Sequence, residues 1–232
     1  MIKILFLAAN PRSMPELDLK AEADAIAAAL RRARYAGHFQ FITHYAVRVS
    51  QLQELLLDHR PHVVHFSGHG TGGGEIILED ERGYVHAVAP DALAETFRLL
   101  GGDLRCVVIN ACYSQPQAEA IARHVEGVIG MAEQIENEAA ITFSAAFYRA
   151  LADGKDLQTA FDLGCNQLQH QRGSGRRRRA GATAGYTPGG RSTNRVMPTL
   201  MNDTVMLSPI TCRKPARLAC IPRARRPTVC WT

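Results

Sequence analysis

Apolar, β-branched runs alternate with amphipathic stretches through the first 170 residues of this 232-residue chain. The apolar runs predict strands at residues 2–8, 38–47, 61–66, 104–111 and 128–131. Apolar positions at helical spacing predict helices at residues 17–35, 49–58, 90–100, 115–124, 138–151 and 157–169, with Ser50 as the N-cap of the second. This alternation is typical of parallel strands joined by crossover helices. We therefore predict an α/β fold with a mostly parallel central sheet and helices on both faces.

The stretch between the third predicted strand and the helix at 90–100 has a different pattern. Glycines stand at positions 68, 70 and 72–74, and two short apolar runs follow at 75–78 and 84–88, separated by a polar turn. This pair predicts a small β-hairpin beside the main sheet. The glycine-rich segment lacks the Lys-Ser or Lys-Thr pair of a phosphate-binding loop, so we expect a mobile loop rather than a nucleotide site.

Charge divides the chain near residue 170. Residues 1–170 hold 14 Lys and Arg against 21 Asp and Glu, whereas residues 171–232 hold 13 against 1. The basic part has four consecutive arginines and no sustained periodicity, so we predict one domain at 1–170 and a disordered Arg/Pro-rich tail at 171–232. The tail lacks interleaved aromatic residues, which disfavours nucleic acid as a partner. An out-of-frame reading of a GC-rich gene is a second interpretation of its composition.

The same patterns disfavour several classes of protein. No apolar run reaches the roughly 18 residues of a membrane span, and the first run is too short for a signal peptide, so we expect a cytoplasmic protein without a membrane partner. The six cysteines show no CxxC spacing, which disfavours a zinc cage and a disulfide framework. Strand alternation puts His62 and His65 on opposite faces, and nothing completes a ligand set. We expect no metal and no other cofactor, packed or surface roles for these two histidines, and a buried, inert Cys106.

Two short motifs carry the candidate chemistry. They are HFSGHG at residues 65–70 and NACYS at residues 110–114, and each begins where an apolar run ends. Because the carboxyl ends of neighbouring parallel strands open into one crevice, we expect His69 and Cys112 to meet there. A histidine beside a thiol can take its proton, and the thiolate can then attack a carbonyl carbon and form a thioester. The backbone N–H groups of Gly70 and Cys112 would stabilise the resulting oxyanion.

These residues resemble the signatures of the CHAT peptidases, a family of caspase-like cysteine proteases in the clan of caspases, metacaspases, gingipains and separase. The resemblance covers residues 1 to about 170 and rests on KILFLAANP at 3–11, RPHVVHFSGHG at 60–70, VVINACYS at 107–114, VIGM at 128–131 and FYRAL at 147–151. It implies a caspase-type sheet, a peptidase domain at 1–170 and a His-Cys dyad at His69 and Cys112. It also implies bacterial relatives fused to adaptor or repeat domains in defence and death-like signalling.

By the same resemblance, the side chain two positions before the nucleophile lines the pocket for the residue that precedes the cut. Here Asn110 would place a neutral amide in that pocket, and we expect Ser67 and Met131 to line the site as well. A preference for a basic residue before the cut would need a negative charge in the pocket, which Glu133 or Glu136 would have to supply. Otherwise these two residues fit a solvated loop.

Members of the family end with a further strand of the Val-Pro-Val-Leu-Leu kind. This chain has a basic segment there instead, with short apolar runs at 195–200 and 204–207. The leading interpretation is a cysteine endopeptidase that cuts protein or peptide substrates in bacterial defence or death-like signalling, with a sensor or adaptor protein as a further partner. The alternatives are a catalytically impaired caspase-like interaction module and, third, an acyltransferase that uses the same dyad.

Overall fold

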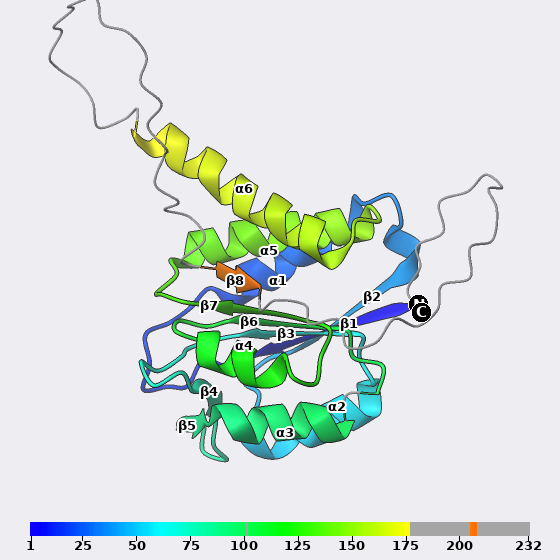
Figure 1. Cartoon of the computed structure of the whole chain (residues 1–232). Coiled ribbons are helices and arrows are strands. Elements are labelled where there is room, and N and C mark those ends of the chain that lie inside the picture. Colours follow the sequence, from blue (N-terminus) through cyan, green and yellow to red (C-terminus); the bar gives the residue numbers. More distant parts are fainter. Residues whose placement is uncertain (101, 177–204, 208–232) are drawn as a thin grey trace, which may run out of the picture.

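A computed structural model describes residues 1–100, 102–176 and 205–207 of the chain. In these residues the main sheet has the strand order β2-β1-β3-β6-β7-β8 (Figure 1). The strands are β1 Ile2–Ala8, β2 Phe39–His44, β3 Val63–Ser67, β6 Cys106–Asn110, β7 Gly127–Met131 and β8 Val205–Leu207. All neighbours pair in parallel except β8, which is antiparallel to β7. The predicted mostly parallel sheet is confirmed.

Helices cover both faces of this sheet, as Figure 1 shows. On one face lie α1 (Leu19–Arg31), α5 (Asn137–Ala152) and α6 (Leu157–Arg176), and on the other α2 (Leu52–His59), α3 (Pro90–Leu100) and α4 (Gln115–Ile121). Each face has its own apolar cluster: Phe6 belongs to the α1 side and the next residue, Leu7, to the α2 side. The central strands contribute side chains to both clusters, which explains why these strands are apolar at consecutive positions.

The predicted hairpin is also present. It consists of β4 (Ile76–Glu79) and β5 (Val85–Val88), which pair antiparallel outside the main sheet. Several hydrogen bonds fasten the hairpin to the main body, two of them as follows. Glu79 N donates to Val47 O at 3.0 Å, and the Gln117 side-chain amide of α4 donates to Val88 O at 2.7 Å.

Some boundaries differ from the prediction for tertiary reasons. A short 3₁₀ helix, η2 (Val49–Gln51), precedes α2, so the N-cap of α2 is Gln51 and the prediction of Ser50 was wrong. The Ser50 hydroxyl instead donates to Glu81, in the hairpin turn, a contact that local sequence does not encode. The first long helix also ends early, at Arg31, and another 3₁₀ helix, η1 (Ala36–His38), precedes β2.

Two parts of the predicted tail belong to elements of the fold. Helix α6 runs on to Arg176, beyond the boundary that we drew at residue 170, and Val205–Leu207 forms β8 at the edge of the sheet. The candidate run at 204–207 therefore contains a strand that follows the last helix. The candidate run at 195–200 and the rest of the predicted tail lie outside the described residues.

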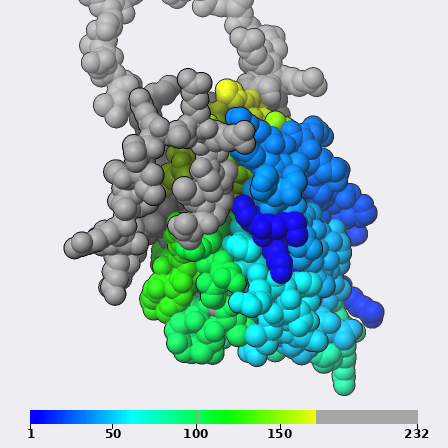
Figure 2. All heavy atoms as spheres, turned by 90° about the vertical axis from the view of Figure 1, so that its right-hand side faces the viewer, coloured from blue at the N-terminus to red at the C-terminus, as the bar shows by residue number. Residues whose placement is uncertain are grey.

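The parallel strands give the molecule two unlike ends. The chain starts at the right of Figure 1, and Figure 2 shows this side, with the first residues in dark blue on the surface. The loops that follow the carboxyl ends of the parallel strands gather at the opposite side, the left of Figure 1. In the part of the chain that the structure describes, no helix is both long enough and apolar enough to cross a membrane.

Gly130 lets β7 pack closely against the segment that leads into α4. A Cβ at this position would lie 2.9 Å from the backbone oxygen of Ser114 and 2.8 Å from the Ala118 Cβ. Backbone atoms cannot give way cheaply, so we expect Gly130→Ala to lower the free energy of unfolding by about 1–3 kcal/mol. Gly37→Ala, where a Cβ would meet nothing within 4 Å, is the control. Urea unfolding measures both, and equal stability of the two variants would contradict this packing.

Candidate active site

The segments that follow β3 and β6 lie directly against each other. Ser67 and Asn110, the last residues of these strands, pair in register, and Gly68 N donates to Asn110 O at 3.2 Å. Two residues further on, the chain at Gly70 is so close to Cys112 that a Cβ on the glycine would lie 2.0 Å from the Cys112 backbone oxygen. Only glycine fits this contact. The residue before it is His69, so the two motifs meet at one edge of the sheet.

His69 is anchored by a backbone carbonyl from the loop after β1. Its Nε2 lies 2.9 Å from the oxygen of Pro15. Burial lowers the pKa of His69 below the ordinary value of 6.5, and the bond to Pro15 offsets this only in part, so the ring is neutral at neutral pH. A carbonyl can only accept a hydrogen bond, so Nε2 carries the ring proton and Nδ1 is left as a proton acceptor. Sequence patterns could not reveal Pro15, because the contact uses only its backbone oxygen.

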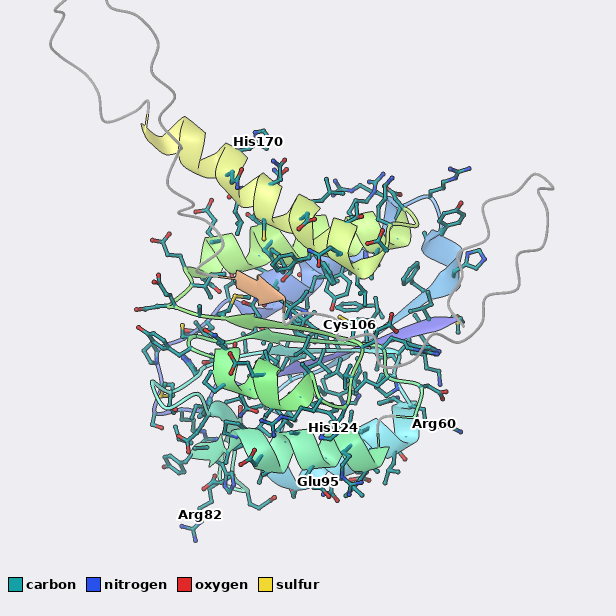
Figure 3. All side chains as sticks on the ribbon, viewed as in Figure 1. Arg60, Arg82, Glu95, Cys106, His124 and His170 are labelled. Atoms are coloured by element: carbon teal, nitrogen blue, oxygen red, sulfur yellow. The ribbon has the colours of Figure 1, made fainter. Side chains whose placement is uncertain are left out.

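The described thiols differ in their surroundings. Cys106 is fully buried in the sheet layer, as labelled in Figure 3, and burial together with nearby Glu126 raises the pKa of its thiol to about 12. Burial and Asp162 likewise raise the pKa of Cys165 to about 11. Both stay protonated at neutral pH, which confirms the predicted inert core role of Cys106. Cys112 is only partly buried and stands at the strand ends.

The chain turns sharply after Cys112. Tyr113 has a φ of 57°, a left-handed conformation that is uncommon outside glycine. The turn is held by the fully buried Ser114, whose hydroxyl donates to Ile109 O and accepts from Met131 N, both at 2.9 Å. These bonds fix the loop to β6 and to β7 at once, and α4 begins at the next residue. The presentation of Cys112 therefore depends on its neighbour's backbone and on one buried hydroxyl.

The N–H groups of Gly70 and Cys112 are free within the described residues. Gly70 faces Ile76 across an isolated antiparallel bridge, whose hydrogen bonds are made by the residues on either side of Gly70. In a pair of this kind the N–H points away from the partner strand. No described acceptor is bonded to either N–H.

The glycine-rich loop carries hydrogen bonds of its own, and the mobility that we expected of it stays a prediction. The Thr71 hydroxyl accepts from Gly73 N and Glu75 N, each at 3.2 Å, and donates to the Glu75 carboxylate at 3.0 Å. Gly74, with a φ of 84°, approaches the ring of Pro116 so closely that a Cβ would lie 2.6 Å from its Cγ. The loop is therefore held against the start of α4.

The predicted pocket residues lie in the interior. Ser67 and Asn110 are 2% and 4% exposed, and both side chains donate to the carboxylate of Glu22 on α1. Met131 is fully buried in the apolar cluster on the α1 side. In this structure the three side chains thus face the interior on the α1 side of the sheet. Their contact with a substrate stays a prediction. Glu133, which we considered as a source of charge, is exposed, as is Glu136.

Sequence patterns did not reveal Glu22, the buried acid at this site. Its Oε1 accepts from Asn110 at 2.6 Å and from Ser144 of α5 at 2.7 Å, and it lies 3.1 Å from Nε2 of the fully buried His65. Burial by itself would raise the pKa of the carboxyl, but the charge of His65 and the hydrogen bonds from His65, Ser144 and Ser67 outweigh it and hold the pKa below its usual value. A glutamate at an apolar position of the α1 pattern was the available signal.

His62 and His65, the other two histidines near the third strand, have structural partners. His65 is packed, as predicted, with its ring stacked on Phe6 and its Nδ1 3.1 Å from the Tyr148 hydroxyl. His62 accepts a hydrogen bond from Lys3 N through Nδ1 at 3.1 Å. Within the described residues, no three His, Cys, Asp or Glu side chains gather in a way that could hold a metal ion.

Solved structures share this fold. A secreted C11 cysteine protease from Bacteroides thetaiotaomicron, solved with an irreversible peptide inhibitor, matches with a TM-score of 0.54 and 12% identity, over 69% of this chain and 56% of that one. Caspase-1 from Spodoptera frugiperda matches with a TM-score of 0.53 and 11% identity, over 90% of this chain and 86% of that one. Together with the sheet order, these matches define a caspase-like α/β protein.

The chain belongs to the CHAT domain family, whose model matches residues 5–179. A probable protease from Gillisia limnaea is 26% identical over 173 residues, which are 72% of this chain and 30% of that protein. A Roc-COR-CHAT protease from an unknown prokaryotic organism is 21% identical over 162 residues, 67% of this chain and 15% of that protein. The chain therefore spans less than a third of the length of either relative.

The buried carboxylate makes the fold sensitive to acid. Because the folded-state pKa of Glu22 lies below 4.5, its ionised form stabilises the fold above that pH, and this stability is lost as the pH falls through the lower, folded-state value. We expect Glu22→Gln to be about 1–3 kcal/mol less stable than the native protein at neutral pH, with the difference shrinking in acid.

Urea unfolding at a series of pH values from neutral to well below 4.5 measures this difference. Glu54→Gln, the same change at an exposed position on α2, is the control and should follow the native protein throughout. A Glu22→Gln difference that does not depend on pH would show that the carboxyl is not ionised in the fold.

Proposed function

We propose that this domain is a cysteine endopeptidase in which His69 and Cys112 form the catalytic dyad. The observation that carries the proposal is the contact of Gly70 with the Cys112 backbone, because it draws the histidine motif against the cysteine motif. The anchored, neutral His69 ring supports it. The names of the two relatives, both proteases, point to the same activity.

In the proposed reaction, Nδ1 of His69 takes the proton from the Cys112 thiol, and the thiolate attacks the carbonyl carbon of a peptide bond. The N–H groups of Gly70 and Cys112 donate to the oxyanion that forms. The C–N bond then breaks, and the proton on His69 passes to the departing amine. Attack by water on the thioester, again assisted by His69, releases the acid and restores the thiol.

The proposal extends to the setting of the domain. Its substrates would be proteins or peptides, and a sensor or adaptor protein would control it in bacterial defence or death-like signalling in the cytoplasm. We place the end of the peptidase domain at the end of α6, with β8 as an added edge strand. This added strand favours an active peptidase over the impaired interaction module, because it gives β7 a neighbour in the sheet.

The dyad predicts two variants without activity. Cys112→Ala and His69→Ala should each abolish cleavage of a peptide library, because the first lacks the nucleophile and the second lacks its proton acceptor. Cys165→Ala, which removes a partly buried thiol on α6, should keep the native activity. Retained turnover in either dyad variant, in a protein that still unfolds cooperatively, would remove the assignment.

Gly70 and Gly72 offer a matched pair on one loop. A Cβ at Gly70 would overlap the Cys112 backbone, whereas a Cβ at Gly72 would meet nothing within 4 Å. Displacement of one oxyanion donor costs about 10²–10³ in rate, so we expect Gly70→Ala to lower kcat/KM by that factor and Gly72→Ala to leave it unchanged. Steady-state kinetics on a library-derived peptide measures both. Equal kinetics in the two variants would show that the contact has no part in catalysis.

A further inference from the structure

The buried Glu22 carboxylate joins the ends of the two strands that lead to the candidate dyad. Ser67 closes β3 and stands two residues before His69, and Asn110 closes β6 and stands two residues before Cys112. The Ser67 hydroxyl donates to Oε2 of Glu22, and the Asn110 amide donates to Oε1 at 2.6 Å. One side chain from α1 thus binds both strand ends, each through a different oxygen.

The carboxylate is itself held in place from the helical layer. Ser144 of α5 donates to Oε1 at 2.7 Å, and Nε2 of His65 lies 3.1 Å away. Glu22 is 2% exposed, so its donors have no water to replace it. An apolar residue there would leave the Ser67 and Asn110 donors buried without an acceptor, which is destabilising for each group.

We propose that Glu22 is a positioning residue, which sets the separation of His69 and Cys112 by fixing Ser67 and Asn110 on a common carboxylate. This inference rests on the proposed function. It goes further because Glu22 touches neither member of the dyad in any described contact and lies beneath the strand ends. An error of about 1 Å in the placement of reacting groups can cost a hundredfold in rate, so small shifts of either strand end matter.

Two serines allow a matched test. Ser67→Ala and Ser144→Ala each remove one buried hydroxyl that donates to Glu22, but only Ser67 lies on a strand that leads to the dyad. We expect similar losses of stability from the two variants. We expect Ser67→Ala to alkylate at Cys112 about tenfold more slowly with iodoacetamide, towards the rate of His69→Ala, and Ser144→Ala to stay within about twofold of the native protein.

Iodoacetamide is small and occupies no substrate pocket, so its rate separates positioning from pocket lining. Peptide mass mapping separates Cys112 from the other cysteines in the full-length chain. With a library-derived peptide, Ser67→Ala should lower kcat and leave KM unchanged. A raised KM with native alkylation would show that Ser67 binds substrate instead, and would overturn the inference.

Glu22→Gln supplies a second variant, because it keeps the size of the side chain and removes the charge. Native alkylation in both Ser67→Ala and a cooperatively folded Glu22→Gln would overturn the positioning role. So would an equal slowing in Ser67→Ala and Ser144→Ala, since it would mark the carboxylate as a general core contact. If Glu22→Gln does not fold, the serine pair decides. If His69→Ala alkylates at the native rate, the dyad itself fails, which is a different result from any of these.

Discussion

The parallel pairing of β3 with β6 is the constraint on which the candidate site depends. It aligns Ser67 with Asn110, the last residues of the two strands. The segments that follow these residues therefore leave the sheet at the same level. Parallel strands have no tight turn between them and are joined through long crossovers, which allows a histidine and a cysteine far apart in the sequence to emerge side by side. The contact of Gly70 with Cys112 then closes the remaining distance, because no side chain stands between the two backbones.

Beneath this edge, the protein places charge where an apolar core would be simpler. Removing a carboxylate from water costs free energy, and this cost is offset only when its oxygens accept hydrogen bonds of good geometry. Glu22 uses both oxygens and binds β3, β6 and α5 at one point. Apolar packing is tolerant of small shifts, whereas hydrogen bonds to two fixed oxygens define position and direction. A buried ionic cluster therefore suits a place where strand ends must be held in register.

Backbone groups contribute as much as side chains to the surroundings of His69 and Cys112. The Pro15 carbonyl fixes the tautomer of His69, and the left-handed Tyr113 turns the chain after Cys112. Among the residues that the structure describes, no acceptor is bonded to the N–H of Gly70 or of Cys112. The side chains of the candidate dyad are therefore only part of the motif. Backbone groups, together with the hydroxyls of Thr71 and Ser114, form the surroundings of these two side chains.

The architecture and the two motifs could be predicted from sequence patterns alone. Apolar runs in β1, β3, β6 and β7 are long enough, and alternate regularly enough with helical patterns, for local physics to decide a parallel α/β sheet. The hairpin followed from two short runs and a polar turn. The motifs around His69 and Cys112 were equally readable, because glycine, histidine and cysteine at strand ends have few other uses.

Which polar side chains are buried together depends on the tertiary packing. We expected Ser67 and Asn110 to line a pocket, yet both side chains donate to Glu22, a residue of a helix far away in the sequence. Ser50 looked like a helix cap but binds Glu81 across the hairpin. Local patterns report which face of an element is apolar. They do not report which distant polar atom will contact a given polar side chain, since that depends on how the helices pack on the sheet.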